Sequence, residues 1–87
     1  MLTPDPLLEE AIDQIVQDMN LVPTSRREGF FMSRIWLLLN PMPDLWVYGT
    51  IGYLNQEFAG HAASEDPILI STLEMLEGMI ALRRLLA

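Results

Sequence analysis

Apolar and polar positions recur along the chain with the period of an α-helix, in segments that proline-bearing breaks separate. The first segment runs from about residue 6 to residue 20, where apolar side chains return every three or four positions. Asp5 followed by Pro6 marks its start, because an aspartate accepts the free N–H groups of the first turn and proline suits the first helical position. The apolar stripe consists of Leu8, Ile12, Ile15, Val16 and Met19.

The second segment follows the break at residues 21–23 and is apolar on nearly every side between residues 30 and 39. Ser25 and Glu28 have the spacing of a capping box, in which the two side chains satisfy N–H groups at the start of a helix. A helix that is apolar all round is usually buried, so we expect this one at the centre of the core. It should end at Asn40, because the prolines that follow disfavour helix.

The last segment, from Asp66 to Ala87, has an apolar face too wide for an ordinary surface helix. Its first two residues repeat the Asp-Pro start signal of the first segment. Two neighbouring apolar rows cover roughly half of the helix circumference, at about 100° per residue. Such a helix is either central to a small bundle or half covered by another chain. One row is Ile68, Thr72, Met75, Met79, Leu82 and Leu86, and the other is Leu69, Leu73, Leu76 and Ile80.

The segment from Leu45 to about His61 supports two interpretations. As a helix capped by Asp44, it would carry an apolar stripe and, opposite, small residues suited to close packing against a neighbouring helix. As a strand, it would use the β-forming residues at positions 46–53, where two glycines also weaken a helix by about 1 kcal/mol each. We favour the helix, because the four-residue spacing persists and a lone strand would have no mate. The stripe is Val47, Ile51, Leu54 and Phe58, and the small residues are Gly49, Gly52, Ala59 and Gly60.

These elements predict a single all-α domain over residues 1–87, built as a compact antiparallel bundle of three or four helices. A chain of this length leaves much of its surface exposed, yet 51% of its residues are hydrophobic. We therefore expect another chain to cover part of the last helix. A homodimer is the simplest symmetric solution, since the same apolar patch on two copies can pack against itself. A heterodimer explains the surplus of hydrophobic surface equally well. The residues expected at that contact are Met75, Met79, Leu82 and Leu86.

Twelve acidic residues against five arginines give a net charge of −7, and the chain contains no lysine. Nucleic-acid binding requires cations that displace the counterions of phosphates, so direct DNA or RNA binding is not expected. Much of the negative charge lies on the first helix, where it forms either a solvated face or a docking surface for a basic partner. The acidic residues concerned are Glu9, Glu10, Asp13 and Asp18.

Features of secretion and membrane insertion are missing from the sequence. The N-terminus lacks the basic and then apolar pattern of a signal peptide. The longest apolar stretch, residues 45–54, is far short of the roughly 20 residues that span a bilayer. The chain also has no cysteine, which is compatible with a reducing compartment. We therefore expect a cytoplasmic protein without membrane association.

The residues with potential catalytic or metal-binding side chains match no known motif of an active site or a metal site. The one histidine, His61, has Glu57 and Glu65 four residues to each side, but a pair of ligands on one helix face does not close a metal site. No serine lies in the Gly-x-Ser-x-Gly elbow of a hydrolase, and no glycines have the spacing of a phosphate loop. The sequence therefore predicts neither an enzyme nor a bound cofactor or metal.

The interpretation we favour is a non-enzymatic module that binds another protein, as an adaptor, a small chaperone or an inhibitor. The apolar last helix would cover the partner's surface, and the acidic first helix would steer the approach. Because Trp and Tyr are frequent at binding hot spots, the predicted surface also includes Trp46, Tyr48 and Tyr53. Two alternatives stay open: a phage- or element-encoded acidic antagonist that mimics nucleic acid, and an assembly factor of a membrane-associated complex.

Overall fold

Within residues 6–57 and 66–87, which a computed structural model describes, all regular structure is helical. Four α-helices lie in these ranges: α1 (Pro6–Met19), α2 (Arg27–Leu39), α3 (Asp44–Glu57) and α4 (Pro67–Leu86). A short 3-10 turn, η1 (Thr24–Arg26), leads directly into α2. The predicted all-α class is therefore confirmed.

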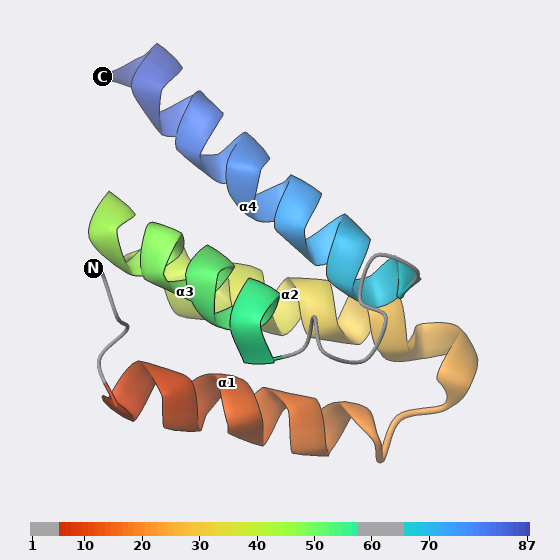
Figure 1. The fold of residues 1–87 in the computed structure, drawn as a ribbon. Coiled ribbons are helices and arrows are strands. Elements are labelled where there is room, and N and C mark those ends of the chain that lie inside the picture. Colours follow the sequence, from red (N-terminus) through yellow and green to blue (C-terminus); the bar gives the residue numbers. More distant parts are fainter. Residues whose placement is uncertain (1–5, 58–65) are drawn as a thin grey trace.

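Successive helices run in alternating directions, as the colour gradient along each ribbon shows (Figure 1). The most extensive contacts join α2 to α4 and α2 to α1, and α3 packs against α4 and α1. The four helices therefore form a ring in the order α1, α2, α4, α3, which places α1 across the bundle from α4. Each helix turns one side toward the centre and keeps another side on the outside.

The centre of the bundle is apolar and includes residues from every helix. Two buried threonines interrupt it, and each donates its hydroxyl hydrogen bond within its own helix: Thr50 to the Trp46 carbonyl at 2.9 Å and Thr72 to the Ile68 carbonyl at 2.7 Å. Their burial therefore leaves no polar group unsatisfied. The buried apolar residues are Leu8, Ile12, Phe31, Ile35, Leu39, Val47, Leu54, Leu69, Leu76, Met79 and Ile80.

The helical interpretation of the third segment is confirmed, because α3 continues through the β-forming residues. Val47, Thr50 and Leu54 are buried at the spacing of one helix face, and Ile51 is half-buried beside them. Phe58 of the predicted stripe lies outside the described residues, as do Ala59, Gly60 and His61. Packing on one face thus outweighs the weak intrinsic preference of the sequence for helix.

Of the four predicted helix starts, the one at Asp66 is confirmed and the one at Ser25 is wrong. Asp44 is itself the first residue of α3, and Asp5 lies outside the described residues. Asp66 accepts the Ile68 N–H at 3.0 Å, and Pro67 is the first residue of α4. The capping box at Ser25 does not form, because η1 takes up this residue and α2 begins two positions later without a side-chain cap. The connection is held instead by Arg27, whose Nε donates to the Val22 carbonyl at 2.9 Å.

The predicted central position of α2 is correct only in part. Phe31, Ile35 and Leu39 are buried, and α2 contacts both α1 and α4. The opposite side of the helix remains outside, where 67% of the Leu37 surface is exposed. An apolar residue on α2 is therefore not necessarily a core residue.

Gly52 does not mark a close approach of two helices, contrary to the expected role of the small residues. A Cβ atom at this position would have no neighbour within 4 Å. Gly49 is buried, and the other two small residues lie outside the described ranges. The half-buried Gly52 is therefore unnecessary for packing and only weakens α3.

We predict that Gly52→Ala raises the free energy of unfolding by about 0.5–1 kcal/mol, because alanine fits the available space and favours helix. Gly78→Ala is the matched control: Gly78 lies in α4, is exposed and also has open space around its Cβ position. Urea titrations followed by circular dichroism should show similar gains for both variants. A loss of stability in Gly52→Ala alone would mean that a helix does pack closely there.

Candidate functional site

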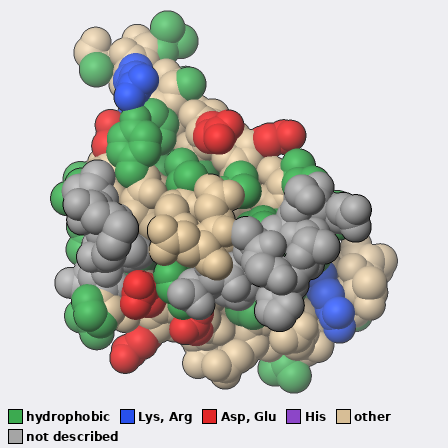
Figure 2. All heavy atoms as spheres, viewed as in Figure 1, with side chains coloured by type: hydrophobic (Ala, Val, Ile, Leu, Met, Phe, Trp, Pro, Cys, Tyr) green, Lys and Arg blue, Asp and Glu red, His purple; other side chains and the backbone are tan. Residues whose placement is uncertain are grey.

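The predicted contact face of α4 divides into a buried part and an exposed part. Met79 is only 3% exposed and belongs to the core, because this position of α4 points between the other helices. Met75 is half-buried, while Leu82 is 47% and Leu86 77% exposed. Figure 2 shows apolar side chains around an arginine at the end of α4, which extends beyond the other helices in Figure 1. The available face therefore excludes Met79.

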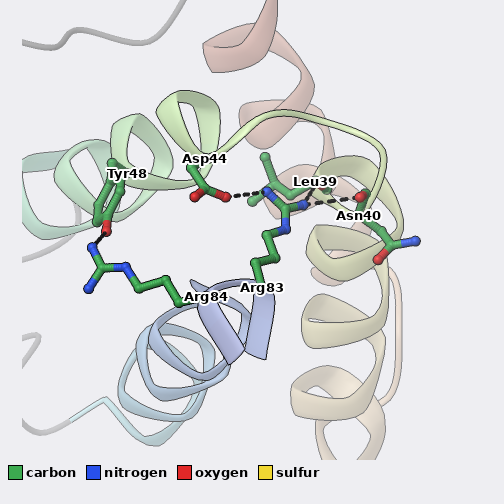
Figure 3. A network of polar contacts seen from close by, with 6 residues as sticks. All are labelled: Leu39, Asn40, Asp44, Tyr48, Arg83 and Arg84. Carbon is green, nitrogen blue, oxygen red and sulfur yellow. Dashed lines mark hydrogen bonds and ion pairs between the residues drawn. The ribbon is translucent and has the colours of Figure 1, made fainter. Parts of the chain in front are cut away.

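Arg83 holds this end of α4 to two other helices (Figure 3). Its Nη1 donates to Asp44 Oδ1 at 2.9 Å, at the first residue of α3. Its Nη2 donates to the carbonyls of Leu39 and Asn40, at 2.9 and 3.0 Å, where α2 ends. Carbonyls at a helix C-terminus lack partners within the helix and attract a cation. One guanidinium thus joins the ends of α2, α3 and α4.

The predicted aromatic surface takes part mainly in internal contacts. The Tyr53 hydroxyl donates to Asp13 Oδ1 on α1 at 2.8 Å, and Trp46 is half-buried against the core. Tyr48 accepts a hydrogen bond from the Arg84 guanidinium and keeps 38% of its surface exposed (Figure 3). These contacts tie α3 to α1 and to α4, so the three aromatic residues stabilise the bundle itself.

The acidic residues of α1 lie on or near its outer side. Glu10 and Asp13 are exposed, and Glu9 and Asp18 are half-buried. Asp13 binds Tyr53, and Asp18 accepts a hydrogen bond from Gln14 at 3.0 Å. Among the described residues the only ion pair is the one between Arg83 and Asp44, so no arginine of this part of the chain neutralises α1.

The outer side of α2 carries a groove that the sequence analysis missed. Two adjoining open hollows form it, with volumes of about 650 and 530 Å³, and they share Gly29, Ser33 and Leu37. Gly29 and Ser33 are one helical turn apart. Because glycine has no side chain and serine a small one, the helix surface at these two positions is lower than its surroundings and forms the floor of the groove. We call these two hollows the α2 groove. Its walls consist of Val22, Ser25, Arg26, Phe30 and Arg34 on one side and Met32, Trp36 and Met75 on the other.

Two of the five arginines of the chain line the α2 groove on the side of η1. Arg26 lies in η1, and Arg34 lies over the Phe30 ring with its guanidinium carbon 5.3 Å from the ring centroid. That distance is within the range of a cation–π contact, which holds the guanidinium over an apolar surface. The groove therefore combines apolar side chains with positive charge.

Neither the described residues nor the comparisons identify a chemical activity. No group of three or more potential metal ligands occurs in the part of the chain that the structure describes. No helix within these ranges is long and apolar enough to cross a membrane. Comparison of the chain with protein-family models, with curated proteins and with solved structures gives no match. The functional argument therefore depends on the α2 groove and its surroundings.

We predict that Arg83→Met lowers the free energy of unfolding by about 1–3 kcal/mol, because it removes the donor of the Asn40 carbonyl and of the Asp44 carboxylate and leaves the Leu39 carbonyl with the Met42 N–H alone. Asp44→Asn removes only the ion pair, whose carboxylate side chain is 47% exposed, and should cost at most about 1 kcal/mol. Chemical denaturation of the two variants gives the comparison. Equal losses would show that the ion pair, and not the carbonyl contacts, holds α4.

Proposed function

We propose that this protein is a non-enzymatic interaction module whose α2 groove binds another protein surface. The observation that carries the proposal is the apolar outer side of α2, where Leu37 is 67% exposed although the same helix contacts α1 and α4 on its inner side. Exposed apolar patches with polar margins are typical of protein–protein contacts.

The form of the groove favours a helix as its occupant. It follows η1 and α2 from residue 25 to residue 37, and the part along α2 alone, from residue 27, corresponds to roughly 15 Å at the rise of an α-helix. A low row made by Gly29 and Ser33 lies between higher side chains, and such a row accepts the ridge of side chains of a second helix. Leu82 and Leu86 add exposed apolar surface on α4.

The residue types that line the groove also favour a protein partner. Trp, Phe, Met and Arg are enriched in the buried centres of interfaces, and Trp36, Phe30, Met32 and Arg34 supply all four types. Methionine adapts its shape to irregular surfaces, and Met75 faces the same hollow from α4. The lining therefore provides area and adaptability without a catalytic group.

We predict that Gly29→Leu removes binding while the fold is retained. The position lies in a helix with open space around it, so leucine should stabilise α2 and at the same time fill the groove floor. Gly78→Leu, at an exposed helical glycine outside the lining of both hollows, is the matched control. Each variant is tested by circular dichroism, by sedimentation equilibrium for self-association, and by quantitative mass spectrometry of proteins recovered from the native cell.

Wild type and Gly78→Leu should show the same association. Gly29→Leu should weaken the association by about tenfold or more, because filling a pocket at the centre of an interface should reduce the binding free energy by ~1.4 kcal/mol or more. Equal association of all three proteins would place the interface elsewhere. A wild-type monomer that recovers no partner would overturn the proposed function itself.

A further inference from the structure

The lining of the α2 groove is positively charged on a chain that is strongly acidic. The sequence has twelve acidic residues and five arginines, yet the described residues around the two hollows include Arg26 and Arg34 and no Asp or Glu. Both arginines are exposed, and neither forms an ion pair with a described residue. The groove therefore differs in the sign of its charge from the protein as a whole.

Arg34 is placed where an acidic ligand could reach it beside apolar surface. Its guanidinium carbon lies 5.3 Å from the centroid of the Phe30 ring. A cation–π contact of this kind positions the guanidinium but uses none of its N–H donors for a hydrogen bond to an acceptor. A carboxylate can accept two such donors at once. The arrangement therefore suits a carboxylate that approaches together with apolar side chains.

The positive charge lies along one side of the groove only. Residues four apart form parallel rows on a helix surface, and the floor at Gly29 and Ser33 lies between two such rows. One row carries both charges and the other is apolar. The charged row is Arg26, Phe30 and Arg34, and the apolar row is Met32 and Trp36. A helix that fits this surface needs an apolar ridge with carboxylates along one side of it.

From this distribution of charge we infer that the occupant of the α2 groove is an acidic amphipathic helix of a different protein. The inference rests on the proposed function and names the chemistry of its partner. The apolar ridge of the partner helix lies over Gly29 and Ser33, and its Asp or Glu side chains face Arg26 and Arg34. Burial of the ridge supplies affinity, and the opposite charges set the orientation and speed the encounter.

The described helices of this chain do not offer such a surface to a second copy. A ridge needs several large apolar residues, and α1 and the first half of α4 expose one each, Leu7 and Ile70. On α3, the acid beside the exposed apolar pair is Asp44, which is already in an ion pair. At the end of α4, the exposed apolar residues have Arg84 beside them, which the groove would repel. These two sets are Leu45 with Tyr48 and Leu82 with Leu85 and Leu86.

The test is a selection of displayed helical peptides of about 18 residues, or five turns, on the immobilised whole chain. In the library, ridge positions at four-residue spacing vary among Ala, Leu, Ile, Met and Phe, and the positions beside the ridge vary equally among Glu, Gln and Lys. The wild type should enrich Glu over Lys by about tenfold or more on one side of the ridge. Gly29→Leu should lose this enrichment, because leucine fills the floor of the groove.

Arg34→Glu and Arg84→Glu are a matched pair, because they change the net charge equally and only the first lies in the groove lining. Arg34→Glu should select Lys at the peptide position that faces residue 34, and Arg84→Glu should keep the preference of the wild type. The Kd of the best Glu-bearing peptide, measured by fluorescence anisotropy, should rise by about tenfold in Arg34→Glu alone. Circular dichroism verifies that each variant is folded.

Equal enrichment of Glu and Lys on the wild type, no enrichment, or enrichment that Gly29→Leu retains would overturn the inference. So would a wild-type dimer that Gly29→Leu dissociates, because the occupant would then be a second copy. The proposed function is judged separately: association with any protein surface that Gly29→Leu abolishes leaves it standing. A wild-type monomer that binds neither peptides nor a cellular protein removes both.

Discussion

The rest of the structure depends on one constraint: the described bundle is so small that no second layer of helices covers the outer sides of its four helices. Each of the four short helices packs mainly against two others in a ring, so every helix keeps an outer side that no other described helix covers. On α1 that side is polar and acidic, which suits contact with water. On α2 it contains Trp36 and Leu37 around a low row of small residues. The difference between these two outer sides is the basis for assigning an interaction surface to α2.

Polar residues are used to join helix ends more than to form a site. Arg83 connects the ends of α2, α3 and α4, and Arg27 holds the turn between α1 and α2. Tyr53 links α3 to Asp13 on α1. These polar residues already form contacts within the bundle. The two arginines of the α2 groove form no ion pair with a described residue and are therefore the more informative ones.

The sequence predicts local structure well, because caps and periodicity are local. The Asp66 cap and the helical character of the third segment follow from the sequence, whereas the capping box that the sequence predicts at Ser25 is replaced by the 3-10 turn. Contacts between residues about 40 positions apart, such as Arg83 with Asp44, have no local signal. Periodicity places Met79 and Leu37 on helix faces, but only the neighbouring helices decide that the first is buried and the second exposed. The small pair Gly29 and Ser33 was the one available signal of the groove.

The central claim is that a protein surface covers the outer side of α2. The most direct test places a photoreactive amino acid at position 37 in the native cell, with the same residue at position 21 as reference, since Leu21 is 85% exposed but lines neither hollow of the groove. The account predicts an intermolecular cross-link from position 37 at much higher yield than from position 21. Equal yields, or none from position 37, would contradict it.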